Sequence, residues 1–180
     1  MAQEQWRRTA APLRLNPMSE KFRKSLLSWI GLLVLFIGLQ SFANRDLADG
    51  MPPPIVGTGT DGQPFAGLSS LKKPAVIYFW ASWCGICKSI QGTIRELAAE
   101  TPMITVALQS GDAAEVKAYM GKEGFQVPVV LDEEGAIGKS YGIRGVPAIF
   151  VLGPDVAIRY STVGYTTALG LRFRLWLAGL

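Results

Sequence analysis

Residues Val76–Lys88 read VIYFWASWCGICK, an apolar run that leads into a pair of cysteines. The first part belongs to Ala75–Trp80, a run of β-branched and aromatic side chains that is typical of a central strand buried on both faces. The second part opens Cys84–Glu100, where isoleucine and leucine recur at spacings of three and four residues, as along one face of a helix. The stretch therefore predicts a buried strand and, after a short turn, a helix that begins at the cysteine pair.

Cys84 and Cys87 are the only two cysteines among the 180 residues. At the start of a helix, Cys84 faces unpaired N–H groups and the positive end of the helix dipole, and both favour a thiolate over a thiol. Cys87 lies one turn further into the helix, where it is shielded and able to resolve a mixed disulfide. We therefore predict a redox-active disulfide, with Cys84 as the catalytic nucleophile and Cys87 as the resolving cysteine.

The cysteine pair has other possible uses. A purely structural disulfide that closes so small a loop would stabilise the fold by only about 2 kcal/mol. A zinc site would lack ligands, because the chain has no histidine and no second pair of cysteines. Copper(I) accepts two thiolates, so a copper-binding or copper-stress protein is an alternative to a redox enzyme. A non-catalytic interaction module is the third hypothesis. For the redox function we predict no metal ligands and no cofactor.

The composition excludes several classes of function. Without histidine, the chain cannot form a Ser-His-Asp or Cys-His catalytic group. The formal net charge of +4 comes from residues 1–24, where six Lys and Arg outnumber two Glu. From residue 50 onward, 11 basic residues balance 10 acidic ones, so the basic charge forms no surface for nucleic acid. We therefore expect no nucleic-acid partner.

Residues 25–44 carry no charge and have a centre rich in Leu, Ile, Val, Phe and Trp. A helix of this length spans about 30 Å, the thickness of one bilayer core. Because basic residues precede the segment, the positive-inside rule places residues 1–24 in the cytoplasm and the rest of the chain across the membrane. We predict a cytoplasmic basic tail (1–24) and a single transmembrane anchor (25–44) in the inner membrane. The alternative is a signal peptide cleaved after Ala43, because Ser41-Phe42-Ala43 resembles a processing site.

The rest of the chain divides into a linker (45–54), which is polar and then proline-rich, and one domain (55–180). Strands are expected at 75–80, 103–108, 127–131, 148–152 and 157–163, and helices at 84–100, 113–121, 136–141 and 167–178. This order predicts an α/β fold, a three-layer α/β/α sandwich whose parallel strands end in an antiparallel edge. In the last helix we expect an inward stripe of Leu169, Phe173, Trp176 and Leu177.

Three stretches resemble a known family. VIYFWASWCGICK at Val76–Lys88 resembles the active-site strand and helix start of thioredoxin-fold proteins. GIRGVPAIFVLGPD at Gly142–Asp155 resembles the loop in which these proteins carry a cis-proline before a hairpin. PPPIVGTGTDGQPFAGLSSLKKP at Pro52–Pro74 resembles the N-terminal hairpin of the TlpA-like, membrane-anchored periplasmic branch. With the predicted anchor, the chain is similar to the ScsD-like (suppressor of copper sensitivity) protein disulfide oxidoreductases of that branch.

The resemblance implies a thioredoxin-like domain with an N-terminal β-hairpin extension, and a thiol-disulfide oxidoreductase that acts in the periplasm. Its clients would be protein thiols and disulfides, and a membrane redox partner would recharge the cysteine pair. Pro147 would be the cis-proline, and Val146 before it would offer a strand-like edge to the client. Trp83 would form a wall of the site, and Trp80 would either do the same or lie in the core.

One position departs from the family pattern. Where thioredoxins carry a buried acid, this chain has Tyr78, and residues 103–109 contain no ionisable group that could replace it. A phenol with a pKa near 10 is a weak base at neutral pH. The sequence therefore does not identify the group that takes the proton from Cys87.

Overall fold

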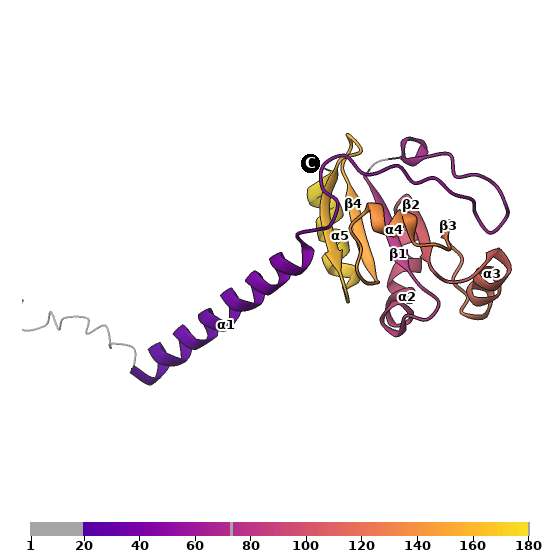
Figure 1. The fold of residues 1–180 in the computed structure, drawn as a ribbon. Coiled ribbons are helices and arrows are strands. Elements are labelled where there is room, and N and C mark those ends of the chain that lie inside the picture. The colour runs from indigo at the N-terminus through magenta and orange to yellow at the C-terminus, as the bar shows by residue number, and fades with distance from the viewer. Residues whose placement is uncertain (1–19, 73, 180) are drawn as a thin grey trace, which may run out of the picture. The chain divides into compact units, whose positions relative to one another are not determined.

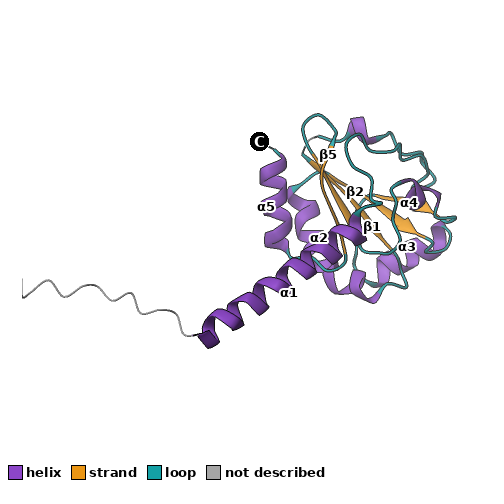
Figure 2. Ribbon diagram, turned by 60° about the vertical axis from the view of Figure 1, so that its left-hand side comes forward, coloured by secondary structure: helices purple, strands orange, loops and turns teal. Residues whose placement is uncertain are grey.

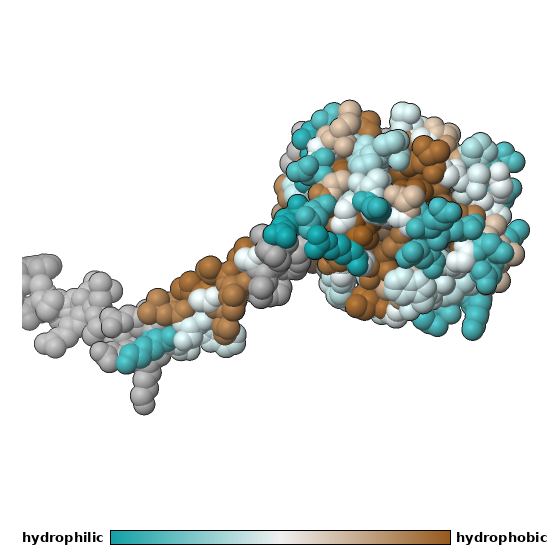
Figure 3. Space-filling model, viewed as in Figure 1, coloured by the Kyte–Doolittle hydropathy of each residue, from teal (hydrophilic) through white to brown (hydrophobic). Residues whose placement is uncertain are grey.

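The computed structural model describes residues 20–72 and 74–179, and its contacts divide the chain into two units, Met1–Phe42 and Ala43–Leu180. Helix α1 (Glu20–Asn44) fills the described part of the first unit. Many of its apolar side chains are exposed, as the brown atoms along the helix in Figure 3 show. No helix of the described residues is both long and apolar enough to cross a membrane, so the anchor predicted at residues 25–44 is not confirmed. Residues 1–19 of the predicted cytoplasmic tail lie outside the described part.

The second unit is built on a five-stranded sheet with the order β3-β2-β1-β4-β5 (Figure 1). The strands are β1 (Ala75–Trp80), β2 (Met103–Leu108), β3 (Val129–Asp132), β4 (Ala148–Leu152) and β5 (Ile158–Val163). β1, β2 and β3 are parallel to one another, whereas β4 is antiparallel to β1 and β5 is antiparallel to β4. β1 lies at the centre and is buried along its whole length, as its unbroken apolar run requires. The predicted mixed sheet with an antiparallel edge is confirmed.

Helices cover both faces of this sheet, as Figure 2 shows, which gives three layers. The helices of the second unit are α2 (Gly85–Glu100), α3 (Ala113–Lys122), α4 (Ala136–Ser140) and α5 (Ala168–Ala178), with a 3-10 turn, η2 (Leu68–Ser70). Alternate side chains of β1 point to opposite faces. Tyr78 and Trp80 pack with apolar residues of α2, α3 and α5, whereas Ile77 and Phe79 pack with α4 and the segment before β1. This is the α/β/α arrangement that the sequence predicts.

The predicted N-terminal β-hairpin is wrong in its extent. In the described part of Pro52–Pro74, strand pairing is limited to an isolated bridge between Thr58 and Pro64, and no strand forms. The turn between them is closed by a hydrogen bond from the Gly59 N–H to the Gln63 carbonyl at 2.9 Å. Proline has no N–H to donate to a strand ladder, and prolines both precede and follow this turn. The extension is therefore a short turn rather than two paired strands.

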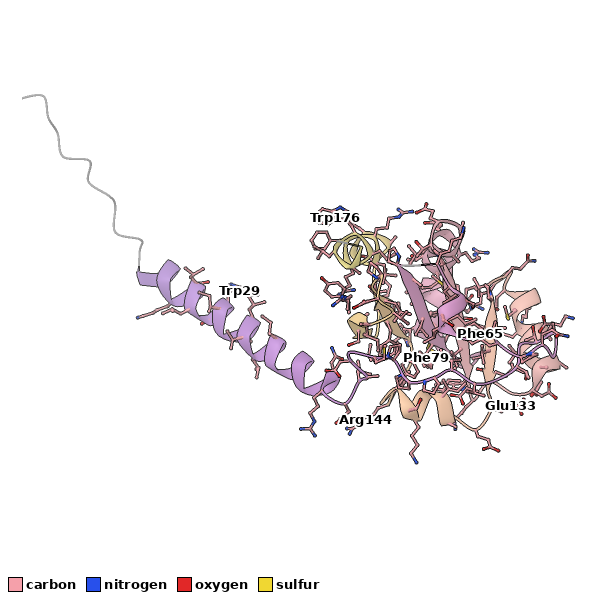
Figure 4. The ribbon with its side chains drawn as sticks, turned by 90° about the horizontal axis from the view of Figure 1, so that it is seen from above. Trp29, Phe65, Phe79, Glu133, Arg144 and Trp176 are labelled. Carbon is pink, nitrogen blue, oxygen red and sulfur yellow. A yellow bond between two sulfur atoms is a disulfide. The ribbon has the colours of Figure 1, made fainter. Side chains whose placement is uncertain are left out.

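The inward face of α5 also differs from the prediction. The side chains buried beneath the helix are Leu171, Leu175 and Ala178. The stripe predicted to point inward is exposed or half-exposed instead, namely Leu169, Phe173, Trp176 and Leu177. Figure 4 shows Trp176 on the side of α5 that faces away from the sheet. Two apolar stripes run along this helix, and the one with smaller side chains fits the close packing of α5 against β4 and α2.

Residues 45–54, predicted as a linker, are packed against the domain. The Ala48 N–H donates to the Tyr141 carbonyl at 3.0 Å, and the Gly50 carbonyl accepts from a main-chain N–H of β5 at 2.7 Å. The Tyr141 hydroxyl donates to the Pro53 carbonyl at 2.8 Å. All three hydrogen bonds use main-chain groups of the segment, so its polar and proline-rich composition gives no sign of them.

Asp132, at the end of β3, holds the start of α4. Its side chain is buried, and its two carboxylate oxygens accept hydrogen bonds from the N–H groups of Ile137 (3.0 Å) and Gly138 (2.8 Å). The first N–H groups of any helix lack partners within the helix, and α4 is only five residues long. Asp132 therefore fixes the helix that leads into the loop before β4.

Replacing Asp132 with alanine should lower the free energy of unfolding by about 2 kcal/mol, because two buried N–H groups lose their partners. Asp132→Asn keeps an acceptor for one N–H but turns an NH2 donor toward the other, so it should cost more than half as much. Urea unfolding followed by circular dichroism measures both values. Equal stability of Asp132→Ala and the wild type would show that apolar contacts alone hold α4 in place.

Candidate functional site

The two cysteines stand at the N-terminus of α2 and form a disulfide with each other. Cys84 caps the helix, and its sulfur accepts a hydrogen bond from the Cys87 N–H at 3.1 Å. Cys84 is 7% exposed, whereas Cys87 is fully buried. The sulfur of Cys84 thus lies at the positive end of the helix dipole and belongs to the more accessible of the two cysteines.

The loop before β4 faces Cys84. The Val146–Pro147 peptide bond is cis, as the family resemblance implies. The Val146 carbonyl oxygen lies 3.5 Å from the Cys84 sulfur. β1 and β4 pair antiparallel with Phe79 opposite Ala148, so the residues that follow β1 and those that precede β4 meet at the same end of the sheet. The sheet itself therefore brings this loop to the disulfide.

Trp83, the residue before Cys84, is 63% exposed. Its indole N–H donates to the Gln109 carbonyl, just after the end of β2, at 2.9 Å. The next residue, Ser110, is buried, and its hydroxyl accepts from the Ser82 N–H at 3.0 Å. Gln109 has a φ of 45°, in the left-handed region that residues other than glycine rarely occupy. Gln109 and Ser110, which follow β2, thus hold in place the residues that lead from β1 to the cysteine pair.

No sequence motif marks Gln109 or Ser110 as part of the site. Neither residue is ionisable. Gln109 contributes its main-chain carbonyl and Ser110 its hydroxyl, and both groups accept hydrogen bonds. The available signal is their position after β2, because the carboxyl ends of neighbouring parallel strands meet at one edge of a sheet. Trp80, in contrast, belongs to the core, because it is fully buried and its indole N–H donates to the Thr105 hydroxyl at 3.1 Å.

An open cavity of about 420 Å³ lies next to residues that adjoin the site in the chain. Its walls include Trp83, which precedes Cys84, and Gly145, which precedes Val146. Polar residues of the same wall are Asp46, Gln109, Glu134, Lys139 and Arg144. Neither cysteine is among the residues that line this cavity.

Lys88, the residue after Cys87, forms an ion pair with Glu123. Lys88 Nζ lies 2.8 Å from Glu123 Oε1, and this hydrogen bond, with the negative charge of Glu123, raises the pKa of Lys88. Its ammonium group is therefore directed to Glu123. Among residues 20–72 and 74–179, no group of three or more Cys, Asp, Glu or His could hold a metal ion.

Tyr78 lies within β1 and belongs to the same buried cluster as both cysteines. Its side chain is fully buried, and its hydroxyl has no hydrogen-bond partner among the described residues. Burial, with a smaller contribution from Tyr119, raises the pKa of Tyr78 far above its usual range. The phenol is therefore protonated at neutral pH, so it places no charge in the position where thioredoxins carry a buried acid.

Tyr78→Phe should raise the free energy of unfolding at neutral pH by up to about 1 kcal/mol, because it removes a buried hydroxyl that lacks a partner. The same substitution should also change how the free energy of unfolding depends on pH in the alkaline range. Since the pKa of Tyr78 is raised in the folded chain, the phenol ionises first in the unfolded chain, and stability is lost as the pH rises above about 10. Urea unfolding at neutral and at alkaline pH measures this effect. Between the two pH values, the free energy of unfolding should fall less for Tyr78→Phe than for the wild type. A variant less stable at neutral pH would mean that the hydroxyl has a partner.

Comparison with known proteins agrees with this site. The Redoxin family pattern matches residues 48–169. A thioredoxin-like protein of Haemophilus influenzae is 32% identical over 164 residues, which cover 88% of this chain and 97% of that protein. The thiol:disulfide interchange protein DsbE homolog of Paracoccus denitrificans is 26% identical over 156 residues, or 80% of this chain and 87% of that protein.

A solved structure agrees with the fold. The crystal structure of a thiol:disulfide interchange protein DsbE from Chlorobium tepidum has a TM-score of 0.64 and covers 73% of this chain and 98% of its own, at 22% identity. The family pattern spans more than half of the chain, and the matched region contains the Cys84–Cys87 disulfide. The chain therefore belongs to the Redoxin family and is a thioredoxin-like thiol-disulfide oxidoreductase.

Proposed function

We propose that the chain exchanges electrons with client proteins through Cys84, the nucleophile, and Cys87, the resolving cysteine. The observation that carries this proposal is the disulfide at the start of α2, in which Cys84 is the more exposed residue and Cys87 is fully buried. The Cys87 N–H and the helix dipole both stabilise negative charge on the Cys84 sulfur, so a thiolate is favoured there once the disulfide is reduced.

In the oxidising direction, a client thiolate attacks the Cys84 sulfur, the Cys84–Cys87 bond breaks, and Cys87 leaves as a thiolate that takes up a proton. A second client thiolate then attacks the client sulfur of the mixed disulfide and releases Cys84. The client gains a disulfide and the protein gains two thiols, so two electrons have moved. In the reducing direction, Cys84 attacks a client disulfide, and Cys87 then attacks the Cys84 sulfur, which releases the reduced client and restores the Cys84–Cys87 disulfide.

Trp83, Val146 and Pro147 are proposed to bind the client. The exposed indole of Trp83 is held by its hydrogen bond and offers an apolar wall. The main chain of Val146 lies beside Cys84, so an extended client segment can pair with it as an added strand. Ile86, between the cysteines, is 50% exposed. This surface favours clients with apolar residues next to their cysteines.

Cys87→Ser should convert transient mixed disulfides into stable ones, because no second thiol of the chain then attacks the bond between Cys84 and the client. Cells that produce this variant should show high-mass adducts on non-reducing gels, and dithiothreitol should remove them. Cys84→Ser is the matched control and should form few adducts or none. If Cys84→Ser trapped as many clients as Cys87→Ser, the two roles would have to be exchanged.

We also propose that residues 25–44 anchor the domain in the inner membrane, with the N-terminus in the cytoplasm and residues 45–180 in the periplasm. The charge pattern supports this topology, because basic residues precede the uncharged segment. The apolar side chains that are exposed along α1 support it too. In this location the chain fits the TlpA-like, ScsD-like branch, and a membrane redox partner would recharge the cysteine pair.

If residues 25–44 form an anchor, the protein should stay with the membrane pellet after washing in alkaline carbonate. Leu32→Arg combined with Leu35→Arg should abolish this retention, because each arginine costs about 3 kcal/mol at the centre of a spanning helix. Alkaline phosphatase fused after Leu180 should be active, since it folds only in the periplasm. A soluble product that begins at Asn44 would reveal a cleaved signal peptide instead.

A further inference from the structure

The segment that enters the domain is attached to the loop that carries the cis-proline. Residues 45–53 are named the strap and residues 142–147 the cis-proline loop. The Ala48 N–H of the strap donates to the carbonyl of Tyr141, the residue before the loop, at 3.0 Å. Gly142 has a φ of +67°, and a Cβ there would overlap the main-chain carbonyl of Asp46. The strap can therefore lie against the loop only because this residue is glycine.

An ion pair joins the same two segments. Arg144 Nη2 lies 2.7 Å from Asp46 Oδ2, and both residues line the cavity beside Trp83. Arg144 is two residues from Val146, whose carbonyl oxygen is 3.5 Å from the Cys84 sulfur. The ion pair thus connects the strap with the main chain that faces the disulfide.

We propose that Asp46 and Arg144 are positioning residues for the redox reaction. Their ion pair holds the cis-proline loop against the strap and so sets where a client segment lies relative to Cys84. This inference rests on the proposed function, in which Val146 and Pro147 bind the client.

The loop needs such a restraint because of its composition. Arg144 stands between Gly142 and Gly145, and glycine restrains the backbone less than any other residue. The first half of the loop is tied down by the Ile143 N–H, which donates to the Gly138 carbonyl at 3.0 Å. Beyond that point, the Arg144 side chain supplies the link to the strap. An exposed ion pair contributes little to overall stability, so its loss should shift the loop without unfolding the domain.

The test is the reduction of insulin by the full chain in detergent, with dithiothreitol as electron donor. Arg144→Gln should raise the KM for insulin about fivefold and change kcat by less than about twofold, because the loop governs docking more than chemistry. Asp46→Asn should raise KM by a similar factor, although it also removes the longer contact of Asp46 Oδ2 with Arg45 Nε at 3.7 Å. The double variant should be no worse than Asp46→Asn alone, because Arg144→Gln then removes no further interaction. Arg144→Lys keeps the charge and should bring KM back to within about twofold of the wild type.

Arg159→Gln is the matched control. It also removes an exposed ion pair, between Arg159 and Asp155 at 2.9 Å, but this pair lies at the turn between β4 and β5 and lines no part of the cavity beside Trp83. Its KM for insulin should equal that of the wild type.

Equal KM values for Arg144→Gln and Arg159→Gln would overturn the positioning role, and so would a change confined to kcat. These outcomes differ from a failure of the proposed function. A wild-type chain that does not reduce insulin, together with a Cys87→Ser variant that traps no client, would overturn the proposed function and the positioning role with it.

Discussion

The pairing of β1 with β2 on one side and with β4 on the other determines the redox site. Because β1 is parallel to β2 and antiparallel to β4, the end of β1, the end of β2 and the start of β4 meet at one edge of the sheet. These three places carry the cysteine pair, Gln109 with Ser110, and Val146. β1 is buried on both faces, so a slip of one residue would exchange its side chains between two differently shaped cores. The packing of β1 therefore fixes the relative positions of groups that are far apart in the chain.

The hydrogen-bond contacts described for the Cys84 sulfur are with main-chain groups. The Cys87 N–H and the dipole of α2 favour a thiolate, whereas the Val146 carbonyl oxygen, 3.5 Å from the sulfur, favours a thiol. Tyr78 is neutral at physiological pH, and Lys88 is held by an ion pair, so neither side chain shifts this balance strongly. The contacts of the Cys84 sulfur are thus set by a helix terminus and a loop, while the residue in place of the usual buried acid is neutral at physiological pH.

How much could be predicted depends on whether the signal is local. β1, β2 and β4 have the bounds expected from the sequence, because an unbroken apolar run in a buried strand is visible residue by residue. The predicted inward face of α5 is wrong, because the helix has two apolar stripes and only the packing against β4 and α2 selects the one with Leu171 and Leu175. Gln109 contributes a main-chain carbonyl, which any residue type carries. Asp46 and Arg144 lie far apart in the chain, so no local pattern pairs them.

The start of the redox domain also depends on contacts between residues that are far apart in the chain. Composition places its start at residue 55, after a polar and proline-rich segment, but that segment binds the domain through main-chain groups and one carboxylate. The contacts of the structure and the family pattern both extend the domain toward the N-terminus. Ala48 and Pro53 form hydrogen bonds with it, its compact unit starts at Ala43, and the family pattern starts at residue 48. Since the strap also lines the cavity beside Trp83, it is part of the redox domain and not a tether to it. A chain shortened to start at residue 55 would keep both cysteines yet lose Asp46 from the wall of the cavity and, with it, the ion pair to Arg144.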